Sequence, residues 1–396
     1  MKIAITGMGI VSAIGHNAEA CKKSLMDGTT GIGKSHHLSS RLTDTHLFGE
    51  VSLSNEELKA ELDIDPNLLI SRTSLLGLKA VKEALSGLTN TPDMKAGFIS
   101  GTTVGGMDRT EGFFREHIID KNDQRITDLL THDCGQSSDT IAHYFGISKY
   151  VNTISTACSS SANSIMMGAN LIKTGRLDRV IVGGIDPLCA FTANGFNSLM
   201  ILDTKWCKPF SENRKGLNLG EGAAFLVLES EQAMEQGGHK ALAYLSGCAN
   251  ANDAYHQTAS SPDGRGATMA MGNALKMAGL APTDIQYINA HGTGTQNNDE
   301  SESTAIHNIF GDTKPPISST KAYTGHTLGA AGAIEAVFSI MALQSQLVFP
   351  NLNFQVPIAQ NDWTPVQEIQ QHQMDHVLSN SFGFGGNNSS LIFSKA

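Results

Sequence analysis

A single cysteine stands where a β-rich run gives way to a helical one, in NTISTACSSSANSIMMGANL, residues 152–171. The short β-branched run 150–154 predicts a strand. Apolar residues recur every three or four positions over 159–174, which predicts a helix that ends at Gly175. Cys158 therefore falls on the strand-to-helix turn. Amides at a helix N-terminus favour a thiolate and can stabilise a nearby oxyanion, so this turn is a suitable place for a nucleophile.

A structural role is the alternative for this cysteine, because cysteine is among the most frequently buried small residues. The residues that surround Cys158 in the fold distinguish the catalytic role from the structural one. No CxxC pair or dense spacing occurs among the six cysteines, so neither a disulfide framework nor a zinc site is expected. A reducing cytoplasm is the default compartment for such a chain. The other five cysteines are at positions 21, 134, 189, 207 and 248.

Two histidines lie in turns built from small residues. In NAHGTGTQNND, His291 follows a short predicted strand, and Thr293 and Thr295 place hydroxyls beside it. In STKAYTGHTLGAAGAIE, His326 precedes a helix that starts with glycines and alanines, which lets another group approach closely. A histidine beside glycines is also commonly a structural residue, so neither position alone indicates catalysis.

Lys321 and Glu335 flank His326 in the sequence and can form an ordinary ion pair. The segment SNSFGFGGNNSSLIF surrounds Phe384 with glycines, whose bare backbone can offer N–H groups to a ligand. The same segment can also be only a bulge before a final strand. A cysteine at a helix start together with two histidines in small-residue turns favours covalent thiol catalysis over these structural explanations.

Other functional classes are disfavoured. GMGIVSAIG follows a predicted strand, but the acid after it, Asp27, stands in a turn-like run, so no nicotinamide site is expected. HQMDH places His372 and His376 four apart without a third ligand, so no metal site is expected. The net charge of −10 and the lack of a Lys/Arg cluster argue against nucleic acid. No signal sequence, membrane span or membrane association is expected either.

Predicted strands and helices alternate along the chain, which is typical of an α/β fold. A polar linker with a Gly-Gly break, EQAMEQGGHK, suits a hinge near 229–239 and divides the chain into halves 1–236 and 237–396. Strands are predicted at 2–6, 96–100, 151–154, 179–183, 223–228, 241–249, 286–289, 316–319, 376–380 and 390–394. Helices are predicted at 17–27, 66–86, 137–145, 159–174, 191–199, 264–278, 298–309 and 328–346.

Together the motifs resemble those of the β-ketoacyl-acyl-carrier-protein synthases, the condensing enzymes of fatty-acid and polyketide synthesis. The resemblance runs through nearly the whole chain, from IAITGMGIVSAIG to NSFGFGGNNSSLIF. It implies a thiolase-like fold with a duplicated, layered αβαβα architecture. The first half would carry the nucleophile and the second half the two histidines. The motifs between the ends are TACSSS, GLNLGEGAAFLVLE, NDAYHQT, NAHGTGT and SSTKAYTGHTLGAAGAIEA.

The resemblance also implies catalytic roles for single residues. Cys158 would accept the acyl group, and His291 and His326 would serve malonyl decarboxylation. Lys321 would be held near the second histidine, with Glu335 as its partner. The presence of His326, where the initiating class has asparagine, points to an elongating enzyme of the type I/II kind. Malonyl-carrier protein would thus extend fatty-acid, polyketide or polyene chains by two carbons.

Substrate contacts follow from the same resemblance. Thr293 and Thr295 would bond the phosphopantetheine arm of the substrate. Phe384 would be the gating phenylalanine, whose N–H joins that of Cys158 in the oxyanion hole. The loop GTTVGGM, residues 101–107, would line the acyl pocket near a dimer interface through Val104 and Met107. No cofactor is expected, since the substrates themselves carry phosphopantetheine on acyl carrier protein.

The expected partners are an acyl carrier protein and a second ketosynthase chain, in a homodimer or a heterodimer. The usual basic docking patch for the carrier protein is poorly represented, which leaves Arg72, Arg125, Lys205 and Lys208 as candidates. Two alternatives stay open: a non-catalytic partner of the chain-length-factor kind, and a ketosynthase of a specialised polyene pathway. Such non-catalytic partners usually lack the nucleophile, which this chain retains. Thiolase-type degradation is a lesser rival.

Overall fold

The computed structural model describes residues 3–89, 94–359, 361 and 363–396. Within these residues ten strands form one mixed sheet in the order β10-β9-β13-β14-β8-β1-β7-β6-β4-β5. Two short hairpin-like pairs, β2 (Ile32–Gly33) with β3 (Phe48–Gly49) and β11 (Leu347–Val348) with β12 (Gln370–Gln371), lie apart from it. The strands of the large sheet are β1 (Ile3–Ser12), β4 (Ala96–Gly101), β5 (Tyr150–Ile154), β6 (Arg179–Asp186), β7 (Gly222–Ser230), β8 (Ala243–Asn252), β9 (Tyr287–Asn289), β10 (Ile317–Ser318), β13 (His376–Gly383) and β14 (Asn387–Ser394).

The sheet repeats one strand plan twice. From β1 outwards the order is β1-β7-β6-β4-β5, and from β8 outwards it is β8-β14-β13-β9-β10. In each half the first two pairings are antiparallel and the last two are parallel. A short antiparallel contact between β1 and β8, with Ile3 opposite Leu245, joins the halves. This repeat is the duplicated α/β plan that the sequence predicts.

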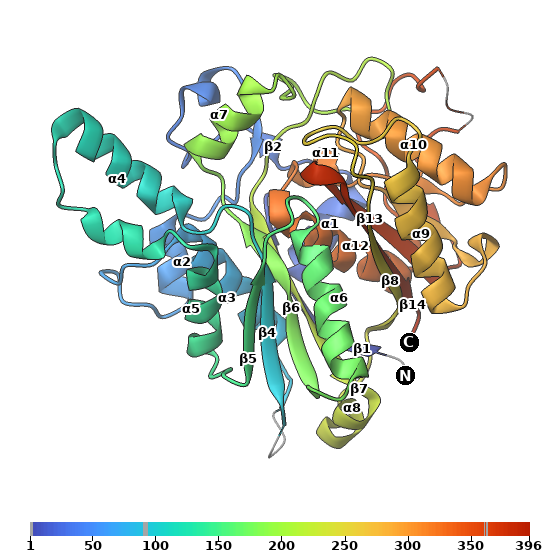
Figure 1. Ribbon diagram of the computed structural model, residues 1–396, viewed down its shortest axis with the longest axis horizontal. Helices are drawn as coiled ribbons and strands as arrows, with labels where there is room; N and C mark the ends of the chain where they lie inside the picture. The colour runs from blue at the N-terminus through green and yellow to red at the C-terminus, as the bar shows by residue number, and fades with distance from the viewer. Residues whose placement is uncertain (1–2, 90–93, 360, 362) are drawn as a thin grey trace.

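Helices and half-sheets stack in five layers. The helices α6 and α12 pack against each other between the two half-sheets, α6 on β6 and β4 and α12 on β13 and β7. Figure 1 shows α3 and α5 on one side of the molecule and α9 and α10 on the other. The helices are α1 (Ala18–Asp27), α2 (Asn55–Glu61), α3 (Arg72–Ala84), α4 (Met107–Asp120), α5 (Cys134–Tyr144), α6 (Ser160–Lys173), α7 (Ala190–Ser198), α8 (Glu231–Gly237), α9 (Arg265–Ala278), α10 (Gln296–Phe310), α11 (Lys321–Thr324) and α12 (Ala331–Ser345).

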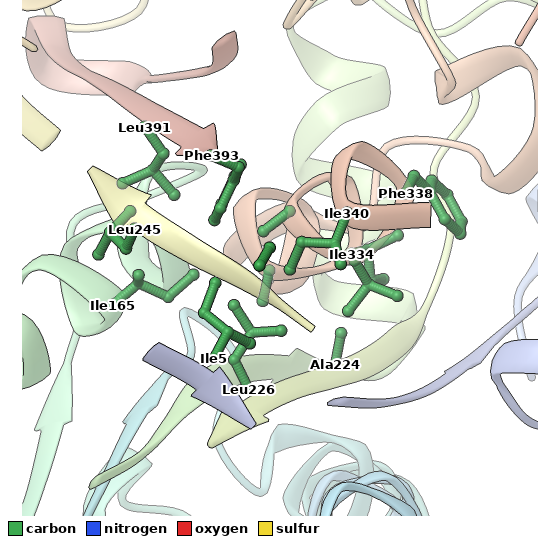
Figure 2. Packing of buried hydrophobic residues seen from close by; sticks show 14 of the residues in the cluster. Ile5, Ile165, Ala224, Leu226, Leu245, Ile334, Phe338, Ile340, Leu391 and Phe393 are labelled. Carbon is green, nitrogen blue, oxygen red and sulfur yellow. The ribbon is translucent and has the colours of Figure 1, made fainter. Parts of the chain in front are cut away.

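The buried side chains follow the two-residue period of the strands. On β7, Leu226 faces the central core, whereas its neighbour Phe225 faces the outer core under α3. Both faces of this strand are covered, which explains its unbroken apolar sequence. Figure 2 shows the central core, where Ile5 and Leu226 from one half-sheet meet Leu245 and Phe393 from the other. The two half-sheets therefore share one central core.

The helix α12 is apolar over most of its circumference, apart from the buried Glu335 and Ser339, because it lies in the middle layer. Length and composition alone would allow the segment Leu328–Ser345 to cross a membrane, with a mean hydropathy of 1.4. However, 89% of that segment is buried inside the protein. Half-sheets cover it on both sides, so its apolar character is accounted for by the core. It begins with a 3₁₀ turn at Leu328–Ala330 and not with a regular helix.

The segment 229–239, where the polar linker is predicted, contains a capped helix, α8, and is not an extended linker. The side chain of Ser230 accepts a hydrogen bond from Ala233 N–H at the start of α8, and Gly238 ends the helix in the left-handed conformation, with a φ of 65°. Glu229 is buried in an ion pair with Arg179. The boundaries 1–236 and 237–396 stay a prediction. No helix is predicted where α4 lies, and the helix predicted at 66–86 begins only at Arg72.

Candidate active site

Cys158 lies on the predicted turn between β5 and α6, and it is 5% exposed. Ala157 before it has a φ of 53°, a left-handed conformation that is uncommon for a residue with a side chain. The Oγ of Ser160 donates to Ala157 O at 2.6 Å and accepts from Thr156 N–H at 2.9 Å. The first helical residue thus closes the turn and fixes the direction of the cysteine.

Burial raises the pKa of the Cys158 thiol to about 12. The positive charge of Lys321 and the backbone N–H groups of Phe384 and Cys158 act in the opposite direction, and Asp186 adds to the rise. The expectation that the helix start keeps a thiolate is therefore wrong for the resting site, since desolvation outweighs these groups. At neutral pH the sulfur carries its proton until a substrate arrives.

His291 follows β9 and is 2% exposed. Its Nδ1 is 3.1 Å from Lys321 Nζ. An ammonium group can only donate, so Nδ1 accepts and the ring proton is on Nε2. Burial, then the charge of Lys321 and the neighbouring His326, hold the pKa of His291 well below its ordinary value. His291 is thus a neutral imidazole with one N–H available for a ligand.

His326 stands beside His291, with ring centroids 5.3 Å apart and planes at 85°. Its backbone N–H donates to Asn218 O at 2.7 Å, and Gly220 N–H donates to its carbonyl at 3.0 Å. Burial and the charge of Lys321 lower the pKa of His326 well below its ordinary value, so this ring is neutral too. Within the described part of the chain, its Nδ1 has no hydrogen-bond partner.

Lys321 and Glu335 form a buried ion pair behind the two rings, with 2% and 3% of their side chains exposed. Burial raises the pKa of Glu335 to about 7, against the effect of the Lys321 charge. The resemblance implied that Lys321 lies near the second histidine. In the structure its hydrogen bond goes to the first, His291, while its charge acts on both rings.

Glu302 of α10 supports His291 and was missed by the sequence analysis. Its two carboxylate oxygens accept the backbone N–H groups of His291 at 2.9 Å and Gly292 at 2.8 Å. It is fully buried, and burial raises its pKa to about 7. An acid on the inner face of the helix predicted at 298–309 was the available signal, since buried acids are rare without a partner.

A cavity of about 450 Å³ opens in front of the cysteine and the two histidines. Lys321 and Glu335 lie behind it and do not line it. Val104 and Met107 do not line it either: Val104 packs in an apolar cluster with Leu188 and Leu217, and Met107 lines a separate cavity beside α4. The predicted site residues that do line the cavity are Cys158, His291, Thr293, Thr295, His326 and Phe384.

Phe384 closes one side of this cavity. Its ring stacks on Phe196 of α7, with centroids 5.7 Å apart and an angle of 15°. Gly385 and Gly386 after it have φ values of 80° and 76°, which other residues rarely adopt, and this explains the glycines of the motif. The hydroxyls of Thr293 and Thr295 lie 2.9 Å apart on the cavity wall.

One of the four basic docking candidates is excluded. Arg72 is 6% exposed and forms a buried ion pair with Glu221, so it is not available to a carrier protein. Arg125 is half-exposed but pairs with Glu116 and Asp128. The remaining two candidates, Lys205 and Lys208, lie at the surface.

Comparison with known families agrees with this geometry. A model of the β-ketoacyl synthase N-terminal domain matches residues 1–233, and a model of the C-terminal domain of the same family matches 242–355. The chain belongs to the β-ketoacyl synthase family. The predicted family is thereby confirmed, and so is the enzyme class, a condensing acyltransferase. The chain is 33% identical to a 3-oxoacyl-[acyl-carrier-protein] synthase 2 of Staphylococcus aureus, over 100% of this chain and 98% of that protein.

Other β-ketoacyl synthase relatives are also similar over the full chain. Nodulation protein E of Rhizobium meliloti is 34% identical, over 99% of this chain and 98% of that protein. The solved ishigamide ketosynthase/chain length factor superposes with a TM-score of 0.94 at 27% identity, over 100% of this chain and 99% of that one. A ketosynthase solved in complex with its chain length factor, from Xenorhabdus doucetiae, superposes with a TM-score of 0.86 at 33% identity, over 100% of this chain and 98% of that one. These similarities confirm the predicted thiolase-like fold.

Proposed function

We propose that this protein condenses an acyl group held on Cys158 with a malonyl group on acyl carrier protein, and so lengthens the chain by two carbons. The observation that carries the proposal is one cavity lined by a cysteine and two neutral histidines. A thiolate is both a good nucleophile and a good leaving group, which suits a residue that must accept an acyl group and later release it.

In the first step the sulfur of Cys158 attacks the carbonyl carbon of the acyl thioester. The developing oxyanion faces the backbone N–H groups of Cys158 and Phe384, which also favour the charged form of the sulfur. The C–S bond to the pantetheine arm then breaks. The proton that leaves Cys158 ends on the departing pantetheine sulfur, so the transfer consumes no acid or base. A resting thiol with a pKa of about 12 is compatible with this exchange.

In the second step malonyl thioester loses carbon dioxide, and the electron pair of the broken C–C bond forms an enolate. The Nε2–H of His291 and an N–H of His326 donate to the enolate oxygen. Neutral rings suit this task, because they stabilise the charge without protonating the carbon. The enolate carbon then attacks the acyl carbonyl on Cys158, and the C–S bond breaks with its electron pair on the sulfur. The sulfur takes up a proton from solvent, and the β-ketoacyl product leaves on the carrier protein.

The carrier and the second subunit belong to the same proposal. Thr293 and Thr295 place hydroxyls on the cavity wall, where they can bond a phosphopantetheine arm. Acyl carrier protein is the proposed donor, with Lys205 and Lys208 as contacts. A homologous ketosynthase chain is the proposed second subunit, in a homodimer or a heterodimer. The type II ketosynthase AntDE, solved with its acyl carrier protein, supports the first of these partners. All six cysteines are free, which suits the cytoplasm.

Intact-protein mass spectrometry after incubation with a panel of acyl carrier proteins tests the proposal. We expect one added acyl mass per chain, located on Cys158 by peptide mapping and absent from Cys158→Ala. A label on Cys134 or Cys207, or on the Cys158→Ala protein, would contradict the assignment. A chain that neither accepts acyl groups nor decarboxylates, yet changes the product length of a second ketosynthase, would identify the non-catalytic alternative.

A further inference from the structure

The side-chain oxygen of Asn387 is the shared acceptor of three hydrogen bonds from two other elements. Ser159 Oγ donates to Oδ1 at 2.7 Å, Asn163 Nδ2 at 2.9 Å and Asn250 Nδ2 at 2.6 Å. Ser159 and Asn163 belong to the start of α6, whereas Asn250 belongs to β8. The mechanism above uses none of these side chains.

Two of the three bonds, those from Ser159 and Asn163, join the two segments that supply the oxyanion hole, and the third ties Asn387 to β8. Ser159 directly follows Cys158, and Asn387 directly follows the 3₁₀ turn Phe384–Gly386. The loops already touch on their other side, because a Cβ placed on Gly383 would lie 3.1 Å from Cys158 N. Asn387 therefore closes a second contact between the backbone segments that present the two N–H groups.

The same cluster ties Asn387 to the turn of the nucleophile. Asn163 Nδ2 also donates to Thr156 Oγ1 at 2.8 Å. Ser159 Oγ lies 2.7 Å from both Thr156 O and Asn387 Oδ1, and its single proton is donated to one of them at a time. Each donor to Asn387 thus has another acceptor nearby. Loss of the Asn387 oxygen would leave these groups paired within α6 and the turn, but would release the segment that carries Phe384.

We propose that Asn387 is a positioning residue that sets the spacing between the N–H groups of Cys158 and Phe384. The inference rests on the proposed function, since it concerns acyl transfer through these two groups. Its effect is confined to the carbonyl on Cys158, because malonyl decarboxylation depends on His291 and His326. A misplacement of a reacting or stabilising group by about 1 Å can cost about a hundredfold in rate.

Asn387→Leu keeps the size of the side chain and removes the acceptor. We expect it to slow acylation of Cys158 from acyl carrier protein by about ten- to a hundredfold, measured by intact mass against time. Release of labelled carbon dioxide from malonyl carrier protein should stay within about twofold of wild type. Asn250→Ala removes one of the three bonds and should slow acylation by a smaller factor.

Ser389→Ala is the matched control, because Ser389 is buried in the same cluster and donates to Asn163 Oδ1 but not to Asn387. It should acylate at the wild-type rate. Acylation of Asn387→Leu within twofold of wild type, or an equal fall in both reactions, would overturn the inference. If Asn387→Leu does not fold, the rates of acylation and of carbon dioxide release in Asn250→Ala test the inference in its place. Failure of wild type itself to acylate would instead reject the proposed function.

Discussion

At the scale of single residues, one ammonium group determines how both histidines work. Lys321 Nζ donates a hydrogen bond to Nδ1 of His291, so the ring proton is on Nε2 and is available to a ligand in the cavity. Burial lowers the pKa of both rings most, and the charge of Lys321 lowers it further. Glu335 balances that charge within the protein. The ion pair therefore helps to keep the two imidazoles neutral and is not only a structural contact.

The two histidines are predicted to serve decarboxylation and not the first acyl transfer. His291→Ala and His326→Ala should each still accept an acyl group on Cys158, while release of carbon dioxide from malonyl carrier protein falls about a hundredfold or more. The effects should not add in the double variant, because both N–H groups address the same enolate charge. A variant that decarboxylates normally but cannot be acylated would show that the substituted histidine instead activates Cys158.

The lowered pKa values predict an unusual pH dependence. A histidine with an ordinary pKa near 6.5 would become protonated as the pH falls through that value, and its charge would alter decarboxylation. Since the pKa of each ring lies well below that value, the neutral forms persist, and protonation of a ring should cause no inflection in the rate between pH 6 and 7. Initial rates of carbon dioxide release across this range measure it. The carboxyl groups of Glu302 and Glu335, with pKa values of about 7, titrate in the same range, so Glu302→Gln and Glu335→Gln are the controls. An inflection near 6.5 that remains in both variants would show that at least one ring is not desolvated as described.

At the scale of secondary-structure elements, close helix contacts position the nucleophile. Gly332 of α12 lies against α6, and a Cβ placed on it would lie 2.9 Å from both Ala162 N and Ala162 Cβ. Gly332→Val should therefore lower the free energy of unfolding by about 1–3 kcal/mol, the usual cost of overpacking a core. Acylation of Cys158 should slow as well, since α6 starts directly after it.

Gly272 provides the matched control within α9. A Cβ there would meet only Ile309 Cδ1, at 3.5 Å, an ordinary contact distance. Gly272→Ala should therefore raise stability by about 0.4–1 kcal/mol through the lower entropy of the unfolded chain. Urea unfolding monitored by circular dichroism measures both variants. Equal stability of Gly332→Val and wild type would show that the helices can separate without cost.

The strands and helices around the site were largely predictable from the sequence. A short β-branched run located β5, and apolar residues at three- and four-residue intervals located α6, so the turn with Cys158 between them was predicted as well. The helix α4 was missed, since its apolar residues, such as Phe114 and Ile118, are exposed and form no buried stripe. The docking role suggested for Arg72 was wrong because its partner Glu221 is 149 positions away in the sequence. Contacts of that range depend on the tertiary fold, and so does the contact between Glu302 and His291, although they are only 11 positions apart.

At the scale of the whole molecule, α4 and the 3₁₀ segment after it extend away from the layered body (Figure 1). Their surface is rich in exposed apolar side chains, and a second ketosynthase chain is the proposed cover for them. Met107 of the loop GTTVGGM lines the cavity beside α4. The exposed residues are Phe114, Ile118, Ile119, Ile126 and Leu130, at 49–72% exposure.

We predict that the active enzyme sediments as a dimer, either of this chain or with a close homologue. Ile118→Glu should shift the population towards monomer, because a charge buried in an apolar interface without a partner is costly. Met26→Glu, at an exposed position on α1, is the control and should leave the dimer intact. A fully active monomer, seen by sedimentation velocity at assay concentration, would contradict a role for GTTVGGM across subunits.

The position of α12 has a consequence for biosynthesis. The helix α12 is made late, yet it packs against β7 and α6 of the first half. A ribosome that has released residues 1–330 has therefore made α6, which covers β6 and β4, but not α12, which covers β7 beside it. The nascent chain cannot complete that layer until Ser345 has left the exit tunnel. Translation order thus leaves the central core incomplete until residue 345 has been made.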